Sequence, residues 1–212
     1  MVITKRQLEV EAIFLISMAA AVSIFFVVYK NNNFSQQFNV LSPLPTQNEI
    51  EVVAPRIATA SQISPDGVKK VIMKVTENLN GTKTYDFSTA DGDGLNEQHI
   101  FTKTLDSLNS ITLPFNTWSP DDKYFFVQEN LGNIKNVLVF KALGEQFSAE
   151  EDYLNATDSF IQKDTGNNFD TATGWASETL IIMNTTKPDN TKGPSYWFEV
   201  PSKAIIRLST EF

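Results

Sequence analysis

A short motif that recurs along the chain is the feature that most constrains its fold. Ser64-Pro65-Asp66-Gly67 is followed by the apolar run KKVIMKV, and Ser119-Pro120-Asp121-Asp122 by KYFFVQE. A degraded third copy, Trp175-Ala176-Ser177-Glu178, precedes TLIIM. The first two copies begin 55 residues apart, and Trp118 and Trp175 lie 57 residues apart. Because a nearly constant period marks an array of similar supersecondary units, we predict about three consecutive units between residues 63 and 212.

Each unit is expected to consist of short antiparallel strands. Proline at the second position of a turn, with Asp-Gly or Asp-Asp after it, favours a tight reversal directly before an apolar strand. Between Ala149 and Lys163, apolar residues recur at nearly helical spacing and acidic residues occupy the first turn. This pattern predicts one short helix there. The predicted fold class is therefore mainly β. Further runs rich in β-branched and aromatic residues supply the other strands, at 82–88, 98–104, 110–113, 136–142, 195–200 and 203–208.

These residues resemble the blades of a known family of β-propellers. The two Ser-Pro-Asp motifs with their apolar strands, and the run WFEVPSKAIIRL from Trp197 to Leu208, look like the WD-repeat-like blades of TolB-type and dipeptidyl-peptidase-type propellers. The resemblance covers residues 60–212 and implies four-stranded blades around an axis. Closed propellers have about four to eight blades. Three blades therefore predict an incomplete propeller, a stack of sheets, or a domain that a partner completes.

An uninterrupted apolar segment near the N-terminus predicts a membrane anchor. Ala12 to Tyr29 reads AIFLISMAAAVSIFFVVY, 18 residues without a charge, close to the roughly 20 that cross a bilayer. Lys5 and Arg6 precede it and Lys30 follows, so the excess of positive charge predicts a cytoplasmic N-terminus. A cleaved signal peptide is the alternative. It would need a small-x-small cleavage site, which the residues after Tyr29 do not offer.

The predicted organisation has four parts: a cytoplasmic N-terminus at 1–11, a transmembrane helix at 12–29, a flexible spacer at 30–62 and a propeller-like ectodomain at 63–212. The spacer is rich in Asn, Gln, Ser and Pro, although Glu49 to Ala54 has the β-branched content of a first or edge strand. The chain has no cysteine, which excludes disulfides and favours a bacterial cell envelope over a eukaryotic secretory pathway. We expect the ectodomain on the extracytoplasmic side of the membrane.

Charge and residue types narrow the function. A formal net charge of −8 argues against a nucleic-acid partner, because binding phosphates requires clustered Lys and Arg. His99 is the only histidine in the sequence, so multi-histidine metal sites are excluded and a Ser-His-Asp triad would depend on this residue. We therefore expect no enzyme activity. The alternative is an envelope hydrolase, or an accessory subunit of one, with Asp91–Glu97 and His99 near its site.

One acidic loop is the candidate metal site. Asp91, Asp93, Asn96 and Glu97 lie close together around two glycines, and closely spaced oxygen ligands of this kind wrap Ca²⁺. The first ligand position holds Thr89, however, and the closing position, where a bidentate Glu would be needed, holds an isoleucine. An acidic hairpin turn without metal is therefore the interpretation we favour, and no other cofactor is expected.

Aromatic residues supply the candidate binding surface: Trp118, Tyr124, Trp175 and Trp197, with Phe115 grouped beside Trp118. Aromatic side chains in grooves bind sugars or peptides, whereas packing in the core is the alternative for residues that alternate along strands. The predicted function is a binding or scaffolding module of the cell envelope. Its partner would be a protein or an envelope polymer, and residues 12–29 would hold it at the membrane.

Overall fold

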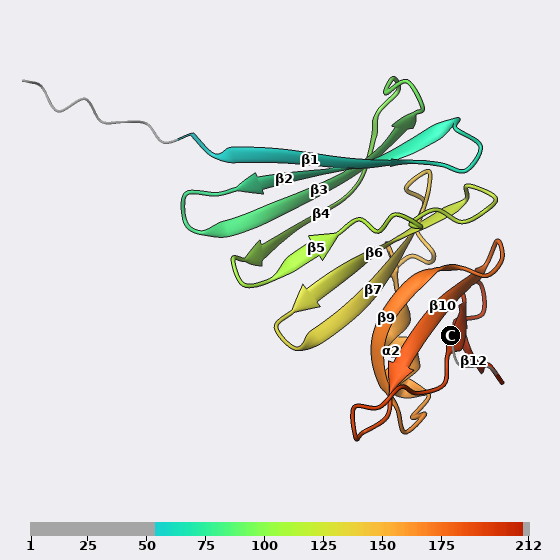
Figure 1. Cartoon of the computed structure of the whole chain (residues 1–212). Coiled ribbons are helices and arrows are strands. Elements are labelled where there is room, and N and C mark those ends of the chain that lie inside the picture. Colours follow the sequence, from blue (N-terminus) through green and yellow to red (C-terminus); the bar gives the residue numbers. More distant parts are fainter. Residues whose placement is uncertain (1–53, 210–212) are drawn as a thin grey trace, which may run out of the picture. The chain divides into compact units, whose positions relative to one another are not determined.

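The computed structural model describes residues 54–209, which form three four-stranded antiparallel sheets (Figure 1). This confirms the prediction of a mainly β fold. In each sheet the strands lie side by side in the order in which they follow in the chain. The predicted N-terminus at 1–11, the transmembrane helix at 12–29 and most of the spacer lie outside the described residues. Within residues 54–209, no helix is long and apolar enough to cross a membrane.

The first sheet contains β1 (Arg56–Ile63), β2 (Lys69–Glu77), β3 (Thr82–Asp91) and β4 (Gln98–Asp106). Except for Ile63, β1 occupies residues that we assigned to the flexible spacer, and it pairs with β2 over its whole length, from Arg56 opposite Glu77 to Ile63 opposite Lys70. The first sheet therefore begins within the predicted spacer. The sequence did not indicate this strand because its residues are exposed, so main-chain pairing rather than burial of apolar side chains holds it.

The middle sheet contains β5 (Ser110–Thr112), β6 (Tyr124–Leu131), β7 (Ile134–Lys141) and β8 (Leu154–Asn155). Its central strands do not alternate between apolar and polar residues, because both of its faces are buried. Phe125 and Val127 belong to the core shared with the first sheet, while Phe126 belongs to the core shared with the third. The middle sheet thus holds the other two together.

A short helix, α2 (Ala156–Gln162), follows β8 directly, inside the range predicted for a helix. Asn155 caps it, because its Oδ1 accepts hydrogen bonds from the backbone N–H groups of Thr157 (3.1 Å) and Asp158 (3.4 Å). Thr157 Oγ1 in turn accepts the backbone N–H of Val137 at 3.1 Å. The helix therefore lies along the edge of β7 beyond the point where β8 ends, and supplies a hydrogen-bond acceptor to that edge.

The third sheet contains β9 (Asn168–Trp175), β10 (Leu180–Thr186), β11 (Tyr196–Glu199) and β12 (Ala204–Arg207). The sequence did not predict β9. Its register with β10 shifts twice, between Ile182 and Met183 and again between Asn184 and Thr185, and such bulges break the two-residue period by which a strand is recognised.

Two hydrophobic cores lie between neighbouring sheets and pack them together. The first lies between the first and middle sheets and includes Val71, Tyr85, Phe87, Phe125 and Phe140. The second lies between the middle sheet, α2 and the third sheet, and includes Phe126, Val139, Phe160, Ile181 and Phe198. The three sheets consequently form one continuous stack of packed layers.

Candidate binding site

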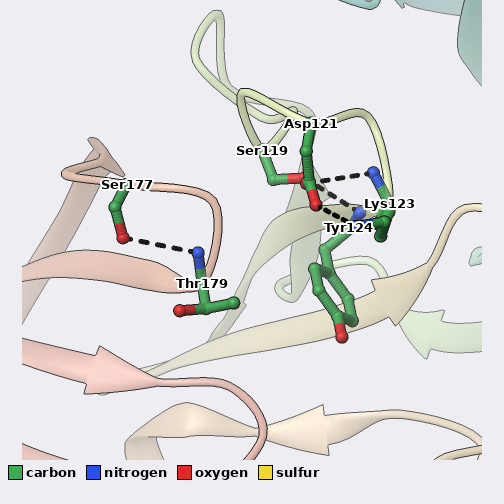
Figure 2. A network of polar contacts seen from close by, with 6 residues as sticks. All are labelled: Ser119, Asp121, Lys123, Tyr124, Ser177 and Thr179. Atoms are coloured by element: carbon green, nitrogen blue, oxygen red, sulfur yellow. Dashed lines mark hydrogen bonds and ion pairs between the residues drawn. The ribbon is translucent and has the colours of Figure 1, made fainter.

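The second Ser-Pro-Asp motif closes the turn that leads into β6 with its own polar side chains (Figure 2). Ser119 Oγ donates a hydrogen bond to Asp121 Oδ1 at 2.8 Å and accepts one from the backbone N–H of Tyr124 at 3.0 Å. Asp121 Oδ1 also accepts the backbone N–H of Lys123 at 3.3 Å. The hydroxyl and the carboxylate therefore satisfy backbone groups that the tight turn leaves without strand partners.

The first motif has the same arrangement, and the third copy has lost most of it. Ser64 Oγ donates to Asp66 Oδ1 at 2.7 Å and accepts the backbone N–H of Lys69 at 3.0 Å. In the third copy Ser177 Oγ accepts the backbone N–H of Thr179 at 3.5 Å (Figure 2). The repeat found in the sequence is thus a repeat of turn chemistry, placed between the first and second strands of each sheet.

Two tryptophans tie neighbouring units together. Trp118 Nε1 donates to the carbonyl oxygen of Gln62 at 2.9 Å, and Trp175 Nε1 donates to that of Thr117 at 3.0 Å. Gln62 and Thr117 occupy equivalent places, two residues before Ser64 and Ser119. Each tryptophan therefore binds the preceding unit at the same point, which brings the segments before the three turns close to one another.

These segments surround a hollow of about 740 Å³. Phe115, with 85% of its surface exposed, and Ile63, with 60%, lie beside it. Asn116 and Gln62 add amide groups, and every side chain that lines the hollow is uncharged. An open, largely apolar hollow with a few polar groups is typical of a binding site. Its remaining apolar lining is Pro65, Trp118, Pro120, Trp175 and Ile182.

The structure brings part of the predicted aromatic surface together. Trp118 and Trp175 line the hollow, but their indole N–H groups are already bonded. Trp118 is buried in the first core, so the half-buried Trp175 is the one of the two that offers ring surface. Tyr124 stacks on Trp175, with ring centroids 6.3 Å apart. Trp197 lies elsewhere, on β11 opposite Ile206 of β12, and does not line the hollow.

Phe115 was predicted only as the aromatic neighbour of Trp118, and Ile63 was not among the predicted site residues. Phe115 follows a proline in a segment without strand periodicity, which is the one signal in the sequence that an aromatic residue there is not part of a strand. Ile63 occupies the place of Trp118 in the first motif, directly before the serine. Its role depends on the packing of three distant segments, which a sequence does not show.

In the acidic loop between β3 and β4, the side chains accept hydrogen bonds from the loop itself and from the end of β3. Asn96 Nδ2 donates to Asp91 Oδ2 at 2.6 Å, the backbone N–H of Leu95 donates to Asp93 Oδ1 at 3.0 Å, and the Ser88 hydroxyl donates to Glu97. These are the contacts of a hairpin turn. Among residues 54–209, no group of three or more histidine or acidic side chains is placed to hold a metal ion. Calcium binding by these residues stays a prediction.

His99 lies in an exposed polar cluster on the first sheet. Its Nε2 is 2.8 Å from Thr102 Oγ1 and 3.1 Å from Asp86 Oδ1, and 62% of its side chain is exposed. In a catalytic triad the acid and the nucleophile contact different ring nitrogens, because one orients the ring and the other gives up its proton. Here both partners meet the same nitrogen, which is not the arrangement of a triad.

Asp122 is the described residue whose ionisation is most strongly altered. Burial, followed by the neighbouring carboxylate of Asp66, raises the pKa of Asp122 from 3.8 to about 6. Its Oδ1 atom is buried without a hydrogen-bond partner. By contrast, the hydrogen bond from Ser64 and then that from the backbone of Val68 lower the pKa of Asp66. The first and second turns thus bring together two carboxyl groups whose pKa values are shifted in opposite directions.

Neither a protein-family model nor a curated protein matches the sequence. Among solved structures, the crystal structure of TolB from Acinetobacter baumannii is similar, with a TM-score of 0.42 and 14% sequence identity, over 74% of this chain and 33% of that one. The chain therefore spans about a third of the length of the TolB structure.

Proposed function

We propose that residues 63–212, together with β1, form a three-bladed, propeller-like binding module that holds a partner protein of the cell envelope at the hollow. The observation that carries this proposal is the exposure of Phe115 beside the uncharged, largely apolar lining of the hollow. Single exposed apolar residues are ordinary on protein surfaces, whereas a cluster of them around a hollow marks a contact site.

The energetics of covering Phe115 support a role as an anchor for the partner. A buried aromatic side chain removes on the order of 150 Å² of apolar surface from water, which is about 3 to 4 kcal/mol at about 25 cal/mol per Å². A few such residues supply most of the affinity of a typical protein interface. The uncharged lining suits an apolar protein segment better than an acidic or phosphorylated ligand.

The apolar segment at 12–29 would hold this module at the membrane, with the N-terminus in the cytoplasm and the ectodomain outside. This part of the proposal derives from the sequence. Protease added to spheroplasts that express the full chain should cut between residues 31 and 53 and release a fragment carrying the ectodomain. Full protection of the chain would contradict an extracytoplasmic ectodomain.

A photo-crosslinking residue in place of Phe115 tests the binding function in cells. The full chain should form a discrete adduct with a partner protein from this position. The matched control places the same residue at Leu108, which is 92% exposed in the turn between β4 and β5 and does not line the hollow. The same adducts from both positions, or none from position 115, would refute the binding site.

A hydrolase, or an accessory subunit of one, with Asp91–Glu97 and His99 near its site, is the alternative function from the sequence, although the contact of both Asp86 and Thr102 with one ring nitrogen of His99 does not favour it. Alanine substitutions of Asp93, Glu97 and His99 decide between the two functions. Loss of a measured hydrolytic activity from a variant that stays folded would replace the binding proposal with this one. Binding at the hollow that is unchanged in all three variants is the result expected of a binding module.

A further inference from the structure

We infer that β1 offers its free edge to an extended segment of the partner protein, which adds a fifth strand to the first sheet. This inference rests on the proposed function, since it names the form in which the partner binds. Among residues 54–209, β1 pairs with β2 on one side, and the order of the first sheet places it at the edge. All of its residues except Gln62, which is half-buried, are exposed.

The strand register shows which backbone groups of β1 have no partner within the described part of the chain. Ser64 donates its backbone N–H to Lys69 O at 2.8 Å, one step beyond the last pair of the β1–β2 ladder. In an antiparallel ladder, pairs that exchange hydrogen bonds alternate with pairs that do not. Gln62, Ala60 and Ala58 therefore turn their backbone groups towards β2. The intervening residues direct theirs outward: Ile57, Thr59, Ser61 and Ile63.

As far as residues 54–209 show, β1 lacks the devices that protect exposed strand edges from unwanted pairing. Such devices are shortness, bulges, charged residues, proline and coverage by other elements. β1 has eight residues in unbroken register, with its one charge at Arg56, the first position. The other outer strands are protected: β5 has three residues, β8 two before α2 begins, and β12 four, while the ladders of β4 and β9 contain register shifts.

The free edge leads into the hollow. Gln62 and Ile63, the last two residues of β1, line it. A strand paired with β1 that continues past Ile63 would therefore place its next apolar side chain against Phe115. Main-chain hydrogen bonds along an edge supply affinity that does not depend on sequence, and a pocket at one end supplies specificity. Together they select an extended, uncharged peptide segment with an apolar side chain at the end beside the hollow.

Proline and alanine substitutions at Ser61 separate backbone pairing from side-chain contact. Ser61→Pro removes one outward N–H but leaves the β1–β2 ladder intact, and proline is tolerated on the solvent side of edge strands. Ser61→Ala is the matched control, since it removes the hydroxyl alone. The probe is a fluorescein-labelled peptide selected from a random 12-residue phage-displayed library on the full chain in detergent micelles. We expect Ser61→Pro to weaken its Kd at least tenfold and Ser61→Ala to change it less than twofold.

Amide hydrogen exchange on the wild-type chain gives a second measurement that needs no substitution. The bound peptide should slow exchange of the Thr59 and Ser61 amides at least tenfold. Unchanged exchange, equal affinities of the proline and alanine variants, or failure to select any peptide would overturn the inference. A chain dimer that Ser61→Pro dissociates would overturn it too, by assigning the edge to a second copy.

The same peptide measured on Phe115→Ser distinguishes this inference from the proposed function. Weaker binding to Phe115→Ser, together with unchanged binding to Ser61→Pro, would keep the hollow as the binding site and reject the added strand. Unchanged binding to both variants would reject both proposals. Loss of affinity in both is the expected result.

Discussion

Asp122 stands where glycine stands in the first motif. Both residues have positive φ, 59° at Asp122 and 77° at Gly67, a conformation that costs glycine little and is tolerated by Asn and Asp among other residues. The carboxylate adds an electrostatic cost, because burial and the nearby Asp66 raise the pKa of Asp122 to about 6. The second motif thus keeps the turn geometry at some expense in stability.

This raised pKa predicts a dependence of stability on pH. Below pH 3.8 Asp122 is protonated in both the folded and unfolded states, and its carboxyl group carries no penalty. As the pH rises to about 6 the unfolded chain releases the proton first, so stability is lost across this window. Asp122→Asn should therefore raise the free energy of unfolding by on the order of 1 kcal/mol at pH 7, allowing for solvent screening, and have little effect at pH 3.5.

Urea unfolding of the two chains at both pH values measures this difference. Asparagine keeps the size of the side chain and tolerates positive φ, so the comparison isolates the charge. An effect of the same size at pH 3.5 and pH 7 would show that the carboxylate charge is not the cause.

The helix α2 acts as a substitute for a strand. β8 pairs with β7 at two positions, and Thr157 in the first turn of the helix accepts the backbone N–H of Val137. Thr157→Val keeps the shape of the side chain but leaves this buried N–H without an acceptor. We expect a loss of about 1 to 3 kcal/mol in the free energy of unfolding.

Thr157→Ser is the matched control for that variant, since it keeps the hydroxyl and removes a methyl group. Urea unfolding should place Thr157→Ser much closer to the wild type than Thr157→Val. Similar losses in both variants would mean that packing around the methyl group, and not the hydrogen bond, determines the effect.

The sequence predicts strands best where turn chemistry and burial act together. β2, β6 and β10 each follow a copy of the motif and bury alternate or consecutive apolar residues, and all three were predicted. β1 and β9 were not, for opposite reasons: β1 is regular but exposed, whereas β9 is partly buried but irregular. A strand that is held mainly by hydrogen bonds to its neighbour's backbone needs no pattern of apolar residues, so its sequence does not reveal it.

At the scale of the whole molecule, the candidate site depends on the stacking of units rather than on any one of them. The sequence indicated Trp118 and Trp175 as aromatic candidates, and both line the hollow. It indicated Phe115 only as the neighbour of Trp118 and did not indicate Ile63, because the hollow forms where three segments from different units meet through the two tryptophan hydrogen bonds. Trp197, chosen by the same reasoning as the other tryptophans, lies on β11 away from the hollow.

The central claim is that this hollow binds a protein segment through Phe115. The most direct test is the Kd of the selected peptide for the full chain, measured by fluorescence polarisation for wild type, Phe115→Ser and Leu108→Ser. Both substitutions replace an exposed apolar side chain with serine, but only Phe115 lies beside the hollow. We expect at least tenfold weaker binding to Phe115→Ser and a change of less than twofold for Leu108→Ser. Equal affinities for the two variants would contradict the claim.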